Sequence, residues 1–269
     1  MKRSDTLLAD HAQRLASQAR CVVVLALAGA LMTSAYAADW FVATNGTGNG
    51  TNWANATNSI QGAIDASNAG DTVLVSNGVY DTGGVSGYPA GTVLTNRIAI
   101  YKAITVRSKD NDPTNTIIKG YWGSPVHYSN AVRCVYMTNG ASLIGFTVTN
   151  GATLTNMPSN ADDRNGGGVW SQSTNTVISN CVLTGNAGVR FGGGAYLGTL
   201  YNCTVSANLA RYSTEGYSYG AGAYGSTLYN CTVIRNGPAN QGAGVYGGIL
   251  YNCTVSSNSS GTGPYGGGA

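Results

Sequence analysis

The chain has 269 residues, among them 14 Lys or Arg and 11 Asp or Glu, and a formal net charge of +3 at pH 7. So small a charge, without a basic cluster, argues against a nucleic-acid-binding protein. Charged residues make up only 9% of the chain and Gly contributes 39 residues. Val, Ile, Leu and Tyr nevertheless recur regularly enough to build a folded core.

Residues 1–37 are predicted to be an export signal. Basic residues precede a short apolar run at Cys21–Met32, and an Ala-Tyr-Ala cleavage pattern ends at Ala37. The run is shorter than the roughly 20 apolar residues that span a bilayer. We expect a secreted or cell-surface protein that does not span the membrane, associated with the outer membrane if its source is Gram-negative. Asp5 and Asp10 are unusual in such a signal and leave an N-terminal membrane anchor as the alternative.

Residues 38–120 are predicted to form an N-terminal cap and the first coils of a repeat. Ile60, Ala63 and Ile64 have helical spacing behind Asn58 or Ser59 as N-cap. A short amphipathic helix here would cover the apolar end of the first coil, as repeat arrays require. The segment at 72–75 then predicts a strand with two Val side chains on one face.

Residues 121–269 are predicted to be repeat coils. The sequence LYNCTV occurs three times, and Cys181, Cys203, Cys231 and Cys253 are spaced by 22, 28 and 22 residues. The longer interval indicates a loop insertion at 209–220. Three short strands separated by Gly and Asn would make one turn of a coil, and turns would stack at about 4.8 Å. The pattern predicts an all-β solenoid.

The Gly-Gly-Gly-Val/Ala-Tyr and Asn-Cys-Thr-Val units resemble the right-handed parallel β-helix repeats of the pectin lyase-like superfamily. The segments SIQGAIDASNAGDTVLVSNGVY, IAIYKAITVRS and SLIGFTVTNG resemble the entry module of that superfamily. Together these segments cover most of residues 40–269. The resemblance implies a right-handed parallel β-helix with a short N-terminal capping helix. It does not imply one activity, because the superfamily includes lyases, hydrolases, adhesins and autotransporter passengers.

The recurring cysteines have three interpretations. A zinc site is disfavoured because no two of them are closer than 22 residues. Disulfides suit an exported chain, but side chains stacked in register point the same way instead of converging. Phe146 occupies the cysteine position in one repeat, which favours a buried column of reduced thiols. One or two bridges remain the alternative, and Cys134 is left unassigned.

Asn202, Asn230 and Asn252 each begin an Asn-Cys-Thr, which is a glycosylation acceptor pattern. The same Asn lies at a sharp bend between two predicted strands. Asn tolerates left-handed backbone angles, so we favour a structural role over glycosylation.

The resemblance implies that an enzyme of this kind would use clustered carboxylates, with Ca²⁺ and an Arg or Lys base in a lyase. Asp162, Asp163 and Arg164, in the insertion at 151–168, are the best candidates. A solvated loop is the favoured interpretation. Asp110 and Asp112 indicate a turn, and His127 is expected to be structural. The sequence identifies no catalytic residue, and we expect no cofactor or metal ion, unless the chain is a lyase that binds Ca²⁺.

Two tyrosine columns are predicted. They are either stacked on each other or presented to a glycan, and stacking is favoured. The first comprises Tyr196, Tyr224 and Tyr246, and the second Tyr201, Tyr229 and Tyr251.

The chain stops within a further Gly-rich unit, so we expect a truncated array with more coils, or a partner, beyond residue 269. The leading hypothesis is an exported, non-catalytic β-helix scaffold, adhesin-like or glycan-contacting, with polysaccharide or a cell-surface glycan as partner. The alternative is a polysaccharide-degrading enzyme of pectate lyase or glycoside hydrolase type.

Overall fold

The computed structural model describes residues 37–123, 130–155, 160–210, 217–261 and 266–268. Residues 37–269 form one compact unit. The predicted export signal lies outside the described residues except for Ala37, so it stays a prediction. Within the described ranges, no helix is long and apolar enough to cross a bilayer.

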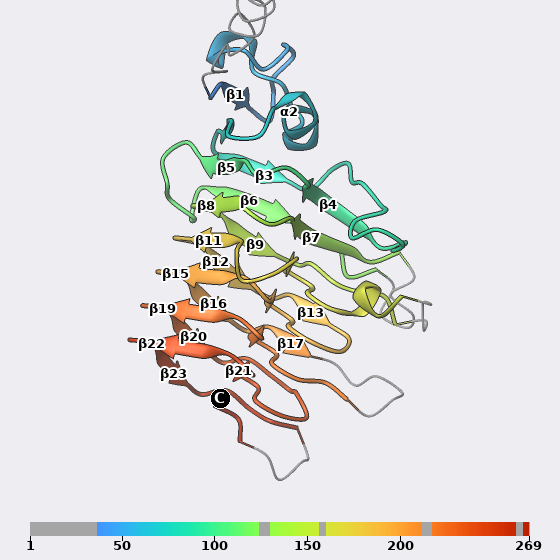
Figure 1. Cartoon of the computed structure of the whole chain (residues 1–269), viewed down its shortest axis with the longest axis vertical. Helices are drawn as coiled ribbons and strands as arrows, with labels where there is room; N and C mark the ends of the chain where they lie inside the picture. Colours follow the sequence, from blue (N-terminus) through green and yellow to red (C-terminus); the bar gives the residue numbers. More distant parts are fainter. Residues whose placement is uncertain (1–36, 124–129, 156–159, 211–216, 262–265, 269) are drawn as a thin grey trace, which may run out of the picture. The chain divides into compact units, whose positions relative to one another are not determined.

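Three parallel sheets run through this unit, and successive turns of the chain add one strand to each of them (Figure 1). The eight-stranded sheet contains β1 (Asp39–Val42), β2 (Thr72–Val75), β5 (Thr105–Ser108), β8 (Ser142–Ile144), β11 (Val177–Ser179), β15 (Thr199–Tyr201), β19 (Thr227–Tyr229) and β22 (Ile249–Tyr251). The seven-stranded sheet contains β3 (Gly78–Tyr80), β6 (Thr116–Lys119), β9 (Thr147–Thr149), β12 (Val182–Thr184), β16 (Thr204–Ser206), β20 (Thr232–Ile234) and β23 (Thr254–Ser256). The six-stranded sheet contains β4 (Thr95–Ile100), β7 (Val132–Met137), β10 (Val169–Ser171), β14 (Ala195–Tyr196), β18 (Ala223–Tyr224) and β21 (Val245–Tyr246).

A short pair of strands, β13 (Ala187–Gly188) and β17 (Leu209–Ala210), makes a fourth sheet. The predicted parallel β-helix is confirmed by this stacking of parallel strands from consecutive turns. The inserted loop at 209–220 begins with β17, and its residues 211–216 lie outside the described part of the chain.

The core lies inside the coil, where equivalent apolar side chains stack from turn to turn. In the eight-stranded sheet, Ile178 pairs in register with Leu200, which pairs with Leu228, and all three are fully buried. Strand residues alternate between faces, so their neighbours point outward. Removing such a side chain, for example Leu228→Ala, costs about 2–5 kcal/mol in stability.

The predicted capping helix is present as α2 (Ile60–Ala66). Ser59, not Asn58, is the N-cap, and its hydroxyl accepts a 2.9 Å hydrogen bond from the backbone N–H of Gly62. Ile60, Ala63 and Ile64 are buried as predicted. The helix packs against β1, β2 and β4, so it covers the first turns of the coil. Two short 3-10 helices, η1 (Trp53–Asn55) and η2 (Ala161–Arg164), complete the structure.

The repeated Asn before each cysteine lies at a bend, as predicted. Asn202, Asn230 and Asn252 have φ of 52°, 52° and 51°. These are left-handed backbone angles, which Asn adopts more readily than most residues. The side chains of the last two also stack, because Asn252 Nδ2 donates to Asn230 Oδ1 at 2.8 Å.

A second, buried Asn column was not predicted. Asn186 Nδ2 donates to Asn208 Oδ1 at 3.0 Å, and Asn208 Nδ2 donates in turn to Asn236 Oδ1 at 3.0 Å. Each amide also bonds the backbone of the preceding turn, as Asn208 Nδ2 does with Leu183 O at 2.8 Å. This network satisfies buried polar groups at a corner of the coil. An Asn five residues after each repeated Cys is the signal that could have revealed it.

The cysteines of the described residues are free thiols. Cys181, Cys203 and Cys231 are buried in one column, which confirms the predicted apolar position. Phe146 belongs to the same column, and its backbone N–H lies 3.4 Å from Cys181 Sγ. Cys134, unassigned from sequence, lies in β7, where burial raises the pKa of its thiol to about 12.

Candidate functional site

The outward face of the six-stranded sheet carries an aromatic column. Strand alternation places Val169, Ala195 and Ala223 inside the coil, while the residue after each of them points outward. The outward residues are Tyr136, Trp170, Tyr196, Tyr224 and Tyr246. Three of them, the first predicted tyrosine column, were foreseen from the repeat; Tyr136 and Trp170 were missed because they fall outside the repeated Gly-Ala-Tyr unit.

The rings in this column stack face to face. Centroid distances are 5.3 Å for Tyr136–Trp170, 5.8 Å for Trp170–Tyr196, 5.5 Å for Tyr196–Tyr224 and 5.7 Å for Tyr224–Tyr246. The predicted ring stacking is therefore confirmed. In β4 the outward position is Ala99, and Tyr88, from the loop before β4, lies next in the column with its centroid 5.4 Å from that of Tyr136 and its ring tilted by 39°.

A second row of rings lies beside this column. Phe191 stacks on Tyr224 with centroids 4.5 Å apart, and Tyr219 stacks on Tyr246 at 4.6 Å. Tyr217 is tilted by 59° to Tyr219 and is 53% exposed. We call Phe191, Tyr196, Tyr217, Tyr219, Tyr224 and Tyr246 the aromatic face. All six side chains are half-buried or exposed, so solvent reaches this surface.

The other predicted tyrosine column is on the eight-stranded sheet. Tyr201, Tyr229 and Tyr251 stack at 4.9 and 4.6 Å, which again confirms stacking. This column is a single row; no second row of rings flanks it among the described residues. Its side chains are exposed at Tyr201 and Tyr251.

Two of the three charged residues of the acidic insertion are buried, so the expectation of a solvated loop is wrong for these two. Asp163 is 1% exposed and Arg164 is 7% exposed. The Asp163 carboxylate accepts backbone hydrogen bonds from Val93 at 3.0 Å and Leu94 at 2.8 Å. These bonds attach η2 to the segment before β4 and satisfy a carboxylate that would otherwise be unpaired in the interior.

Arg133 holds the other side of the same insertion. Its guanidinium is fully buried and donates to Asn96 Oδ1 and to the carbonyls of Asp162, Asn165 and Gly166. Burial lowers the pKa of Arg133 to about 10, and the nearby carboxylates oppose that shift. Arg133 therefore positions η2 through backbone contacts and remains charged at neutral pH.

Asp162 is the half-buried member of the predicted acidic group. Its Oδ1 accepts long hydrogen bonds from Trp170 Nε1 at 3.3 Å and Asn165 Nδ2 at 3.4 Å. The structure thus brings Asp162 to Trp170, within the aromatic column, and turns Asp163 into the interior. A catalytic pair requires two carboxylates that converge on one exposed point, and the carboxylates of Asp162 and Asp163 do not.

The other predicted candidates lie elsewhere. Asp112 accepts from Thr114 and Asn115 within its own turn, which confirms the turn, and the backbone hydrogen bond from Thr114 lowers its pKa. Asp110 accepts from Asn77. His127 lies outside the described residues, and within those residues no group of three His, Cys, Asp or Glu side chains could hold a metal ion.

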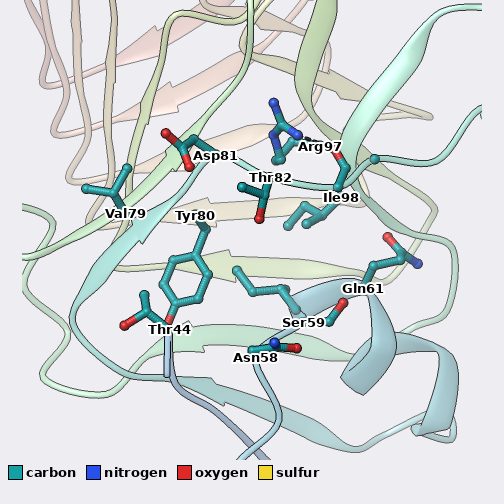
Figure 2. A pocket seen from close by; sticks show the side chains of 13 residues that line it. Thr44, Asn58, Ser59, Gln61, Val79, Tyr80, Asp81, Thr82, Arg97 and Ile98 are labelled. Carbon is teal, nitrogen blue, oxygen red and sulfur yellow. Dashed lines mark hydrogen bonds between the residues drawn. The ribbon is translucent and has the colours of Figure 1, made fainter. Parts of the chain in front are cut away.

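A cavity of about 400 Å³ lies between α2 and the turn that follows β3 (Figure 2). Ile60, Tyr80 and Ile98 give it apolar walls. Its rim is polar except for the exposed Val79 and comes from four separate segments of the chain, which is why sequence reasoning missed it. The rim residues are Thr44, Asn58, Ser59, Gln61, Asp81, Thr82 and Arg97.

Comparisons with known proteins give structural similarity at low sequence identity. No protein-family model matches the sequence, and no curated protein matches it. A pectate lyase is similar with a TM-score of 0.48 and 18% identity, over 77% of this chain and 50% of the lyase. A rhamnogalacturonan lyase is similar with a TM-score of 0.48 and 13% identity, over 80% and 62%.

A pectin methylesterase from carrot is similar with a TM-score of 0.46 and 16% identity, over 78% of this chain and 56% of the esterase. This chain therefore spans about half the length of the pectate lyase. The fold rests on the stacked parallel sheets described above, and similarities at this level do not assign an activity.

Proposed function

We propose that the chain is an exported, secreted or cell-surface β-helix scaffold that contacts polysaccharide through the aromatic face and performs no catalysis. The observation that carries the proposal is the double row of rings on the outside of the six-stranded sheet. Stacked aromatic rings with exposed edges and hydroxyls combine apolar contact area with hydrogen-bonding groups, which suits a sugar chain.

The geometry defines how a glycan would meet this surface. Within the column on the six-stranded sheet the ring faces cover each other. A ligand at this column therefore meets ring edges and phenolic hydroxyls. Tyr217, tilted away from Tyr219 and 53% exposed, presents ring surface beyond the stacks. Because equivalent rings repeat from turn to turn, the face offers similar contacts along successive coils. An extended polymer gains from such repetition more than a small ligand does.

The fate of the acidic insertion supports a non-catalytic role. Asp163 is occupied by two backbone N–H groups, and Asp162 is engaged by Trp170 and Asn165. The group that was the best catalytic candidate therefore serves to attach a loop to the coil.

Affinity electrophoresis tests the proposal. The full chain is run through gels containing polygalacturonate, rhamnogalacturonan, xylan, mannan or β-glucan, and at least one polymer is expected to retard it. The double variant Phe191→Ala/Tyr219→Ala is expected to lose most of this retardation. Tyr229→Ala, which removes a stacked ring from the other column, is the matched control and retains it. Equal loss in both variants, or no retardation by any polymer, contradicts the proposal.

A further inference from the structure

We propose that the cavity beside α2 is a second binding site, separate from the aromatic face, that takes one uncharged sugar ring or a similar small polyol. This proposal does not depend on polysaccharide binding at the aromatic face. The cavity volume of about 400 Å³ lies at the small end of the range for ligand sites, about 300–1,000 Å³, and suits a single small molecule.

The walls of the cavity are rigid and apolar. Ile60 and Ile98 are 3% and 2% exposed and belong to the core. Tyr80 is 8% exposed, and its hydroxyl donates to the carbonyl of Ser76 at 3.0 Å. The hydroxyl of Tyr80 is thus occupied, and the ring contributes apolar surface to the cavity, against which the C–H groups of a sugar ring can pack.

Arg97 contributes a buried cation to the wall. It is 8% exposed, its Nε donates to Lys119 O at 2.8 Å, and its Nη1 donates to Gly83 O. The second bond fixes the turn after β3 that forms one side of the cavity. Nη2 makes no hydrogen bond to another described residue. It is not one of the buried atoms that lack a hydrogen-bond partner, so this donor is open to solvent, and a ligand oxygen in the cavity would replace water on it.

Asp81 contributes an exposed anion to the same cavity. It acts electrostatically on Arg97, but no direct ion pair joins the two among the described residues, and both line the cavity (Figure 2). Because the two charges do not pair, the Arg97 guanidinium can donate a hydrogen bond to a ligand while the Asp81 carboxylate accepts one from it.

This charge arrangement selects the chemistry of the ligand. A carboxylate or phosphate would be attracted by Arg97 but repelled by Asp81, and an ammonium group would be attracted by Asp81 but repelled by Arg97, so the pair favours neither charge. A hydroxyl both donates and accepts, so neighbouring hydroxyls of one sugar can donate to Asp81 and accept from Arg97. The hydroxyls of Thr44 and Thr82 and the amide of Asn58, on exposed parts of the rim, add hydrogen-bonding groups of both kinds.

Saturation-transfer NMR on the full chain tests the site with methyl glycosides. The panel contains neutral hexosides and pentosides, a cationic amino-sugar glycoside and an anionic uronide. We expect saturation transfer to at least one neutral glycoside and weaker transfer to both charged classes. Preference for a charged glycoside, or no transfer to any, overturns the proposal.

Two variants locate the binding. Asp81→Ala is expected to weaken it by about tenfold or more, because a charge-assisted hydrogen bond is lost. Thr82→Trp changes an exposed rim residue and is expected to abolish binding by filling the cavity. Asp110→Ala removes an exposed carboxylate outside the cavity and should leave binding intact, as should Phe191→Ala/Tyr219→Ala. Binding that survives both cavity variants, or that is lost only with the aromatic face, contradicts the proposal.

Discussion

The carboxylate of Asp163 accepts a 2.8 Å hydrogen bond from the backbone N–H of Leu94, a residue 69 positions earlier in the chain. The bond joins the acidic insertion to the loop before β4, and Asp163 is 1% exposed. A charge cluster that looks like a solvated or catalytic loop in the sequence is therefore a buried attachment point for two distant segments.

Replacing Asp163 with Ala is expected to destabilise the fold by about 2–4 kcal/mol, because two backbone donors lose a charged acceptor in the interior. Asp162→Ala, at the neighbouring position, removes only two long hydrogen bonds from a half-buried group and should cost less than about 1.5 kcal/mol. Urea unfolding followed by circular dichroism measures both. Equal destabilisation would show that the bonds from Val93 and Leu94 are not the main contribution.

The buried Asn column is expected to be a major source of stability. Asn208→Ala leaves the backbone N–H of Asn186 and the amide of Asn186 without their common acceptor, and we expect a loss of about 2–3 kcal/mol. Asn175→Ala, on an exposed loop, serves as the control and should change stability by less than about 0.5 kcal/mol. A similar unfolding midpoint for the two variants would refute a structural role for the column.

Substitutions at the bend residues should change stability according to how readily the new residue adopts a left-handed backbone conformation. Asn230 has φ of 52°, so Asn230→Gly is expected to be tolerated, whereas Asn230→Val should cost about 1–2 kcal/mol or more. Thermal unfolding of the two variants gives the comparison. If Val were as well tolerated as Gly, the left-handed bend would not be what selects Asn at this position.

Cys134 should make stability fall at alkaline pH. Burial raises the pKa of its thiol to about 12, against about 8.5 for an exposed thiol. The thiol therefore ionises first in the unfolded state, so its contribution is complete below about pH 8.5 and is lost between about pH 8.5 and 12. The slope it adds approaches 1.4 kcal/mol per pH unit. Unfolding at several pH values should show a shallower slope for Cys134→Ala; an unchanged slope would contradict the burial effect.

The proposed absence of catalysis predicts no unsaturated product from polygalacturonate or other uronate polymers, with or without Ca²⁺. Ultraviolet absorbance of the reaction mixture measures this. Activity that disappears in Asp162→Ala or Asp163→Ala while the variant remains folded would establish the alternative function and show that the insertion is catalytic.

The repeat made most of the fold predictable. The spacing of the cysteines gave the turn length, the Asn before each one marked a left-handed bend, and the tyrosines recurring with this period indicated stacking. Each of these features lies within one turn and recurs in the next turn. The position of a residue in the repeat therefore predicts its position in the coil.

Contacts that are made once could not be predicted in this way. Asp163 meets Leu94 across 69 residues, and Tyr88 fills the place above Ala99 from a loop outside the period. The cavity beside α2 collects residues from four segments. The local pattern of hydrophobicity does not specify these long-range contacts, because they depend on how non-repeating loops pack on the coil.

Hydroxyl-radical footprinting of the full chain, with and without a polysaccharide that retards it in gels, tests the central claim most directly. The account predicts that the polymer protects Phe191, Tyr217 and Tyr219 from oxidation and leaves Tyr201 and Tyr251, exposed on the eight-stranded sheet, unchanged. Protection of Tyr201 and Tyr251 instead, or equal protection on both sheets, would contradict the assignment of the aromatic face as the glycan-binding surface.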